Sequence, residues 1–248
     1  MIEVCQLHKS FGQQQVLCGV DLQIDEGESV VIIGGSGCGK SVLLRHIIGL
    51  VQPDAGDVKI DGQGIADLSE RELVTVRRKF GMLFQGSALF DSLTVEENVG
   101  FLLDREQTMS PSQIRETVAD ALELVDLGGT QAKKPAELSG GMKKRVGLAR
   151  AIVYKPEIIL YDEPTTGLDP VVADSIDQLV VKMRDQLNCT SIVVTHDTRS
   201  MRRVGNRVMM LHHGRIHANG TPEEIFNSTD PVVHKFVNGI ADPKDLEF

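Results

Sequence analysis

The 248-residue chain lacks tryptophan, contains only two tyrosines and has no long apolar run. Its hydrophobic stretches are only a few residues long, so the sequence predicts neither a membrane-spanning helix nor a secretion signal. The hydrophobic content of 41% is still sufficient for one well-packed core with an inserted lobe. We therefore expect any role at a membrane to depend on a partner protein.

The chain also lacks a net positive charge and paired cysteines. Its formal net charge of −9 argues against a surface that follows phosphate backbones, so we expect no nucleic-acid partner. The four cysteines form no C-x-x-C pair and have no histidine at metal-ligand spacing, which favours a reducing, cytosolic setting. These residues are Cys5, Cys18, Cys38 and Cys189.

A glycine-rich loop from Gly34 to Ser41 fits the pattern G-x-x-x-x-G-K-[ST]. Apolar residues 29–33 predict a buried strand before the loop and residues 42–48 a helix after it, which is the context that the motif requires. The glycines leave backbone N–H groups free to surround the β- and γ-phosphates of a nucleotide. A purely structural glycine turn would not explain Lys40 and Ser41 at these offsets.

The residues of this loop have separate predicted roles. Lys40 is placed to reach the β/γ oxygens, and the Ser41 hydroxyl is placed to hold Mg²⁺. Cys38 occupies a variable position that tolerates a small side chain. The predicted nucleotide-binding residues of this segment are Gly34, Gly35, Ser36, Gly37, Cys38, Gly39, Lys40, Ser41 and Val42.

A second phosphate motif, Ser139-Gly140-Gly141, lies about a hundred residues downstream. Ser139 is expected to cap a helix from Gly141 to about Tyr154, and the positive end of that helix would face phosphate. The segment Leu160-Tyr161-Asp162-Glu163, which ends in two acidic residues, follows this helix. Two phosphate motifs in this order indicate a nucleotide site built from two separate pieces, and so an ATPase that dimerises to work.

The acidic pair Asp162 and Glu163 follows the apolar residues 158–161, which predict another buried strand. The carboxyl ends of parallel strands are the usual ligand edge of such sheets. There Asp162 would bind Mg²⁺ or its water, and Glu163 would accept the proton of the attacking water. His196 follows a further predicted strand at residues 191–194, although a lone histidine is more often structural than catalytic.

The strand and helix patterns predict an α/β protein with a mostly parallel, helix-covered core sheet and an N-terminal antiparallel β subdomain. Helices are expected to begin at Pro111, after the cap Ser110, and at Pro170, after Asp169. The predicted strands are residues 2–7, 20–24, 57–60, 80–84, 158–161, 191–194 and 208–211.

Over nearly its whole length the chain resembles the ATP-binding subunits of ABC transporters, whose motifs occur here once each and in order. After the phosphate loop come the Gln loop, the signature, the acidic strand end, the D-loop and the switch histidine. In this chain these are Gln85, Leu138-Ser139-Gly140-Gly141-Met142, Asp162-Glu163, Gly167-Leu168-Asp169 and His196. The resemblance implies a P-loop ABC ATPase that uses ATP and Mg²⁺, as a homodimer with two ATP molecules sandwiched head to tail.

The resemblance also implies roles for single residues. Gln85 would bind nucleotide and metal and carry the nucleotide state toward a partner, and His196 would contact the γ-phosphate or orient Glu163. Phe11 is equally compatible with a core or a ligand position from its place alone, and the resemblance favours stacking on adenine. The signature residues Ser139, Gly140 and Gly141 would bind the nucleotide of the opposite subunit. The implied catalytic residues are Glu163 and His196, and the implied metal ligands are Ser41, Gln85 and Asp162.

We expect a single ABC ATPase domain of residues 1–248 with three parts. Four of the eight phenylalanines, Phe80, Phe84, Phe90 and Phe101, fall within or just before the start of its helical part, and most of them would belong to the core. The segment 85–93 would also suit a groove for a partner's short helix. The parts are a RecA-like core with the antiparallel β subdomain (1–85 and 135–220), an inserted helical subdomain (about 86–134) and a C-terminal extension (221–248).

Within the family the likeness is greatest to the ATPases of Mla/Mce-type lipid transporters. It implies phospholipid transport that maintains outer-membrane lipid asymmetry, transmembrane permease partners and a peripheral position on the cytoplasmic face of the inner membrane. Substrate-binding Mce-domain subunits and small accessory subunits would be further partners. Val42 stands where many relatives have threonine, but Ser41 is retained, so metal binding is still expected. The likeness rests on residues 34–44, 88–95, 138–145, 221–226 and 230–239.

Two other functions stay open from the sequence. The chain could power an importer for another cargo, such as an amino acid, with identical chemistry. It could also be a soluble ABC ATPase that acts on an assembly scaffold or on chromosomes. The absence of a long coiled-coil insert and of zinc-ligand pairs argues against the chromosome branch, whereas the segment around Phe90 and the basic run 143–145 favour membrane coupling. The tail after Pro231 would contact the second protomer or an accessory subunit.

Overall fold

The computed structural model of the chain describes residues 1–240. They form two compact units, one of residues 1–77 together with the chain from Ile192 onward, and one of residues 78–191. The predicted division into core, helical subdomain and C-terminal extension stays a prediction. The last eight residues of that predicted extension lie outside the described part of the chain.

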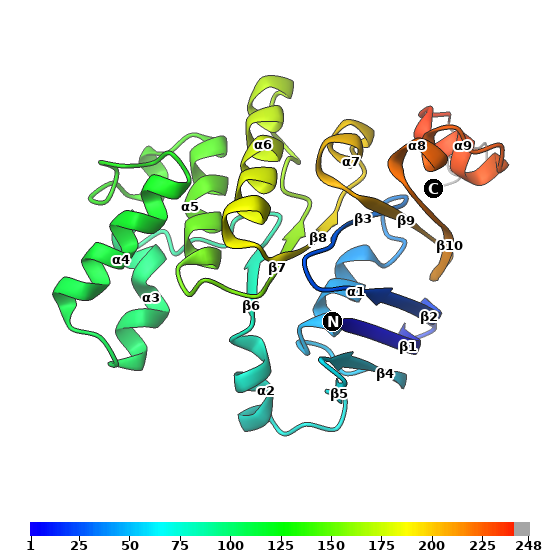
Figure 1. Cartoon of the computed structure of the whole chain (residues 1–248), viewed down its shortest axis with the longest axis horizontal. Helices are drawn as coiled ribbons and strands as arrows, with labels where there is room; N and C mark the ends of the chain where they lie inside the picture. The colour runs from blue at the N-terminus through cyan, green and yellow to red at the C-terminus, as the bar shows by residue number, and fades with distance from the viewer. Residues whose placement is uncertain (241–248) are drawn as a thin grey trace. The chain divides into compact units, whose positions relative to one another are not determined.

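The first unit contains an antiparallel sheet of four strands in the order β2-β1-β4-β5. Its long hairpin pairs Ile2 with Ile24 and Phe11 with Gln14, and β4 pairs along the other edge of β1. Figure 1 shows β1, β2 and β4 side by side. This sheet confirms the expected antiparallel strands near the N-terminus. The strands are β1 (Ile2–Phe11), β2 (Gln14–Ile24), β4 (Ala55–Ile60) and β5 (Gln63–Gly64).

A second set of strands in this unit has the order β10-β9-β3-β8. β3 runs parallel to β9, and β10 is added antiparallel as a hairpin that the sequence did not predict. Every residue of β3 is buried, as expected for a strand covered on both faces. The strands are β3 (Ser29–Ile33), β8 (Thr190–Val194, of which the last three residues belong to this unit), β9 (Arg207–His212) and β10 (Arg215–Gly220).

The first unit also holds five helices among its described residues. They are α1 (Lys40–Ile47), α2 (Glu70–Arg77), α7 (Thr198–Val204), α8 (Pro222–Phe226) and α9 (Pro231–Val237). Only α1 was predicted, because the others are short and their periodicity is weak. α8 and α9 each begin with a proline after a capping Thr221 or Asp230.

The second unit pairs β6 (Phe80–Leu83) with β7 (Ile158–Asp162) in parallel. Its helices α3, α4 and α5 pack against one another, as Figure 1 shows in green. Within residues 1–240 no helix is both long and apolar enough to cross a membrane. The helices are α3 (Val95–Glu106), α4 (Pro111–Leu124), the 3₁₀ turn η1 (Pro135–Glu137), α5 (Gly140–Ile152) and α6 (Pro170–Leu187).

The helix starts predicted in this unit are confirmed by their caps. The Ser110 side chain accepts a hydrogen bond from the Gln113 N–H, and the Gln113 side chain accepts one from the Ser110 N–H, which completes a capping box. Asp169 Oδ1 accepts hydrogen bonds from the N–H groups of Val171 and Val172 at the start of α6. Capping oxygens thus fix where these helices begin.

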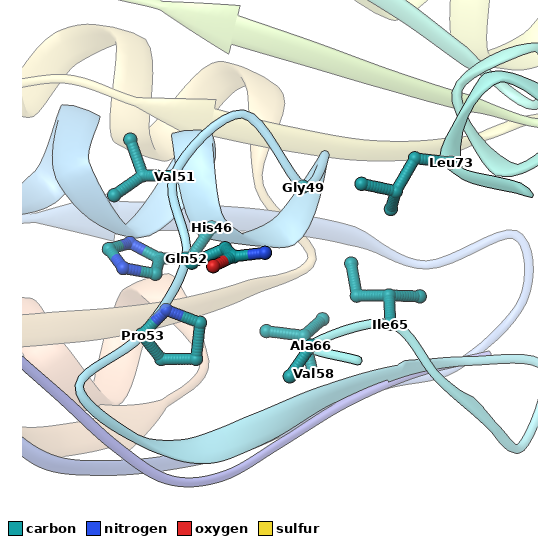
Figure 2. Close-up of a pocket in the computed structure, with 9 residues that line it drawn as sticks. All are labelled: His46, Gly49, Val51, Gln52, Pro53, Val58, Ile65, Ala66 and Leu73. Carbon is teal, nitrogen blue, oxygen red and sulfur yellow. The ribbon is translucent and has the colours of Figure 1, made fainter. Parts of the chain in front are cut away.

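A small pocket in the first unit lies beside the C-terminal end of α1 (Figure 2). Its free space is about 10 Å³, comparable to one water molecule and far too small for a nucleotide. Figure 2 shows His46 beside Gln52 on one side of the pocket, with Ile65 and Leu73 on the other. The lining residues are His46, Gly49, Val51, Gln52, Pro53, Val58, Ile65, Ala66 and Leu73.

His46 is the ionisable residue that lines this pocket, and it is only 1% exposed. Its Nδ1 lies 2.7 Å from the Val42 carbonyl oxygen, which places a proton on Nδ1. Its Nε2 has no hydrogen-bond partner among the described residues. Burial lowers the pKa of His46, and this outweighs the opposing influence of the Val42 backbone.

We predict that His46 makes folding stability depend on pH in the mildly acidic range. The folded-state pKa lies below the ordinary value of 6.5, so the unfolded chain takes up the proton more readily as the pH falls. The stability contributed by neutral His46 is complete above pH 6.5 and is lost as the pH falls toward the folded-state pKa. Urea unfolding of the wild type between about pH 7.5 and 5 should show this loss.

The His46→Gln variant should show a smaller pH dependence in the same range, and His234→Gln, at an exposed histidine, serves as the control. Equal slopes for the wild type and His46→Gln would contradict the assignment. Carboxyl groups whose pKa is lowered in the folded state, such as Asp126, reduce stability only at a more acidic pH than His46 does. Their contribution to the pH dependence of unfolding is therefore separate from that of His46.

Candidate nucleotide-binding and hydrolysis site

The phosphate loop follows β3 directly and has a backbone that only glycine accommodates at two points. Gly34 has a φ of 154°, and a Cβ there would lie 2.3 Å from the Leu211 carbonyl oxygen. Gly39 has a φ of 105°, and a Cβ there would lie 3.0 Å from a Val16 methyl group. Both ends of the loop are therefore packed against neighbouring strands. The tip between them, residues 35–37, is exposed.

Lys40 begins α1 and is 7% exposed. Its Nζ donates hydrogen bonds to the carbonyl oxygens of Gly34 and Gly35, at 2.9 and 3.0 Å. The ammonium group therefore lies inside the loop rather than in solvent. Gly39 supplies no side-chain cap to α1, and the first turn of the helix carries no acidic residue. The N-terminus of α1 thus presents N–H groups and a positive charge, which is the arrangement that binds phosphate.

Phe11 lies at the end of β1, and its ring is 51% exposed. It pairs with Gln14, two residues before Val16, whose methyl group packs at Gly39 of the phosphate loop. The Lys9 ammonium lies 5.6 Å from the centre of the Phe11 ring. An exposed aromatic ring on the hairpin that flanks the loop is compatible with the predicted stacking on a base.

His196 lies at the same end of the first unit as the phosphate loop. The N–H of the preceding residue, Thr195, donates to the carbonyl oxygen of Ile32, near the end of β3. Thr195 Oγ1 in turn accepts a hydrogen bond from the Asp197 N–H, and Asp197 caps α7. His196 itself is exposed. The turn that carries this histidine is therefore fixed on both sides while its ring can meet a ligand.

The acidic pair lies in the second unit, at the carboxyl end of β7. Asp162 is the last residue of the strand and is 5% exposed, and Glu163 is 8% exposed. Glu163 has a φ of 50°, in the left-handed region that non-glycine residues rarely adopt. The Thr166 hydroxyl donates to Glu163 Oε2 at 3.0 Å. The strand end thus holds two buried carboxylates, one of them on a strained backbone.

The signature residues form the N-terminus of α5, where the cap is confirmed. Ser139 Oγ accepts a hydrogen bond from the Met142 N–H at 3.3 Å, and Ser139 and Gly140 are exposed. Gly141 is buried, and a Cβ there would lie 2.5 Å from a Val172 methyl group at the start of α6. The absence of a side chain at this position therefore lets α5 and α6 begin close together.

Lys144 is a functional candidate that the sequence did not predict. It is 5% exposed, and its Nζ donates to the carbonyl oxygens of both Gln85 and Glu163. Gln85 is exposed, and its backbone carbonyl shares the Lys144 ammonium group with that of Glu163. Burial lowers the pKa of Lys144, and the charges of Asp162 and Glu163 oppose this. The sequence offered one signal for this role. Lys144 lies three residues after Gly141 and four before Leu148, which places a lysine on the buried side of the expected helix.

The predicted site residues therefore fall into two groups. The first unit carries Phe11, residues 34–42 and His196, and the second carries Gln85, Ser139 to Gly141, Asp162 and Glu163. A family model described as "ABC transporter" matches residues 17–166, which include both groups except Phe11 and His196. The chain belongs to the ABC transporter family. It is an ATP-binding ABC ATPase.

The curated relatives of this chain are named for the transport of different substrates. It is 44% identical over 238 residues to the "Probable ribonucleotide transport ATP-binding protein mkl" of Mycobacterium leprae, covering 96% of this chain and 69% of that protein. It is 40% identical over 243 residues to the "Intermembrane phospholipid transport system ATP-binding protein MlaF" of Haemophilus influenzae, covering 98% and 92%. It is 43% identical over 227 residues to the "Methionine import ATP-binding protein MetN" of Carboxydothermus hydrogenoformans, covering 89% and 66%. The chain thus spans about two thirds of the Mycobacterium and Carboxydothermus proteins.

Solved ABC cassettes share the fold. The cassette MJ0796, solved as a dimer in a post-hydrolysis state bound to ADP and Pi, matches with a TM-score of 0.82 and 36% sequence identity. The match covers 90% of this chain and 99% of that one. This confirms the predicted fold class of an ABC ATPase, and the chain has a mixed sheet with parallel strands, an antiparallel sheet of N-terminal strands, and helices. The role of each site residue stays a prediction.

Proposed function

We propose that this chain hydrolyses ATP to power phospholipid transport in an Mla/Mce-type complex that maintains outer-membrane lipid asymmetry. The observation that carries this cargo is the similarity to MlaF, which extends over 92% of that protein's length at 40% identity. The amino-acid sequence of the motifs at residues 88–95 and 138–145 supports the same assignment. In this proposal the chain is peripheral on the cytoplasmic face of the inner membrane and binds transmembrane permease subunits, Mce-domain subunits and small accessory subunits.

The phosphate loop would bind and orient the triphosphate of ATP. Lys40 already lies against the loop carbonyls, so binding would exchange its contacts with Gly34 and Gly35 for phosphate oxygens. Phe11 would stack on the adenine. These contacts hold the γ-phosphoryl group in one place, and such positioning supplies much of the rate gain in phosphoryl transfer.

The donor set fits Mg²⁺ as the metal. Within residues 1–240 no cluster of three His, Cys, Asp or Glu side chains could hold a metal by itself. Mg²⁺ instead binds through one or two protein oxygens together with substrate phosphates, and Ser41, Asp162 and Gln85 offer such oxygens. When bound, the ion neutralises charge on the phosphates. We propose these three residues as its protein ligands.

Glu163 would act as the general base for the attacking water. A carboxylate that is almost fully buried and held by the Thr166 hydroxyl keeps a fixed direction, which a base in phosphoryl transfer requires. His196 would contact the γ-phosphate or orient Glu163. The exposed Gln85 would report the bound nucleotide to the permease.

The signature helix would act on the nucleotide of a second copy. Ser139 and Gly140 are exposed at the N-terminus of α5, where N–H groups and the helix dipole favour phosphate. Two ATP molecules would then lie head to tail between two protomers, and neither site would be complete in a monomer. Loss of the γ-phosphate would release the protomers, and this cycle would shift the permease between conformations.

An importer for another cargo is the second candidate, because the similarity to the methionine-import protein reaches 43% over 89% of this chain. The chemistry of this subunit would be the same in both cases. The cargo therefore has to be identified on the complex rather than on the ATPase.

The cargo assignment is tested by purifying the native complex through a tag on this chain and identifying its subunits and bound small molecules by mass spectrometry. We expect a multispan permease, an Mce-domain subunit and co-purified phospholipid above the level of a tagged, unrelated membrane complex from the same cells. A permease without an Mce-domain subunit and without enriched lipid would support the importer. A soluble scaffold in place of a permease would contradict both.

Glu163→Gln should bind ATP with near wild-type affinity but lower the steady-state turnover by roughly 100-fold or more, because it removes the general base while preserving size. ATPase assays and nucleotide titration of the full-length chain measure the two quantities. The control is Glu116→Gln, at an exposed position of α4, which should keep wild-type turnover. Unchanged turnover in Glu163→Gln would reject its catalytic role.

A further inference from the structure

Helix α5 is bound to the Gln85 segment by side chains that neither the motifs nor the proposed function account for. A Cβ on Gly147 would lie 2.9 Å from a Leu83 methyl group and 3.3 Å from Ser87, so the helix packs closely against this segment. Three residues further on, the Arg150 guanidinium donates to the carbonyl oxygens of Ser87 and Ala88, both at 2.7 Å. One face of α5 thus follows the chain just after β6.

This segment needs such support because its backbone is strained. Ser87 and Ala88 have φ values of 60° and 47°, two consecutive non-glycine residues in the left-handed region. Strain of this kind persists only where the surrounding structure holds it, and it concentrates at functional sites. Ser87 is only 2% exposed, in agreement with a turn held from within. The turn directly follows Gln85 and Gly86.

Glu163 shows the same combination of strain and a basic partner from α5. Its φ is 50°, and its carbonyl oxygen lies 3.1 Å from Lys144 Nζ. The same ammonium group contacts the Gln85 carbonyl oxygen. Lys144 is buried, so these contacts are sheltered from water, and a shift of either carbonyl would disturb the other.

We propose that Lys144 is a positioning residue for ATP hydrolysis, which joins the backbone of Gln85 to that of Glu163. This inference rests on the proposed function, because it takes Glu163 as the general base. Lys144 acts through the two backbones and does not contact the reacting atoms. Its ammonium group has three donors in a compact tetrahedral array, which suits two carbonyl oxygens that approach from different segments. Any displacement of the Gln85 segment would thereby move the backbone that carries the base.

The test is the steady-state ATPase activity of full-length Lys144→Met, Lys144→Arg and Lys144→Gln, together with ATP affinity and thermal melting. Methionine keeps the length of the side chain but removes all donors. We expect Lys144→Met to lower kcat by roughly ten- to hundredfold with KM and ATP affinity within about twofold, since small misplacements of a catalytic group have effects of this size. The donor-bearing Arg or Gln variant should recover much of the loss. The control is Lys155→Met, at an exposed lysine just beyond α5.

Assays are made well below the melting temperature of each variant, so that a fall in kcat does not report unfolding. A kcat for Lys144→Met within twofold of the wild type, a KM that rises in parallel with the loss, or no recovery in both donor-bearing variants would overturn the proposal. The Glu163→Gln assay distinguishes a failure of the proposed general base from a failure of the positioning role of Lys144. If Glu163→Gln loses turnover while Lys144→Met keeps it, only the positioning role is wrong, whereas wild-type turnover in Glu163→Gln removes the proposed base itself.

Discussion

The site depends on one backbone constraint, which is that the chain must turn sharply where it leaves the carboxyl ends of its buried strands. After β3 the turn begins at Gly34, where the carbonyl of Leu211 leaves no room for a side chain. After β7 the turn begins at Glu163, which adopts the left-handed conformation without being glycine. In the first case the turn presents N–H groups, and in the second it presents a carboxylate. In the proposed mechanism, these strand ends would supply the phosphate-binding groups and the base of phosphoryl transfer.

Positive charge stabilises these turns from inside the protein. Lys40 binds the carbonyl oxygens of the phosphate loop, and Lys144 binds those of Gln85 and Glu163. A buried ammonium group is stable only where acceptors surround it, so each lysine also fixes the backbone around it. The two lysines differ in their expected fate. Lys40 would exchange its contacts for phosphate, whereas Lys144 would keep them through the cycle.

The sequence predicted those parts of the molecule that local patterns determine. Strands β3 and β7 are continuous apolar runs, and α4, α5 and α6 begin at capping residues that face their own first turn, so both can be recognised without tertiary contacts. β10 was missed because its sequence, RIHANG, has one large apolar residue and no alternating apolar pattern, whereas its strand state is seen from its pairing with β9. Lys144 was missed for a similar reason, because its carbonyl partners lie 59 and 19 residues away in the chain. The strain at Ser87, Ala88 and Glu163 likewise has no signal in the residue types.

The central claim is that a nucleotide held by the phosphate loop of one copy is closed over by the signature helix of another. Ser139→Cys tests it directly, because the native Cys38 lies in the loop and a thiol crosslinker can join the two across copies. In the Glu163→Gln background with ATP and Mg²⁺, the account predicts a covalent dimer that is lost when Cys38 is replaced by alanine. A covalent dimer that persists without Cys38, or no crosslinking in any nucleotide state, would contradict it.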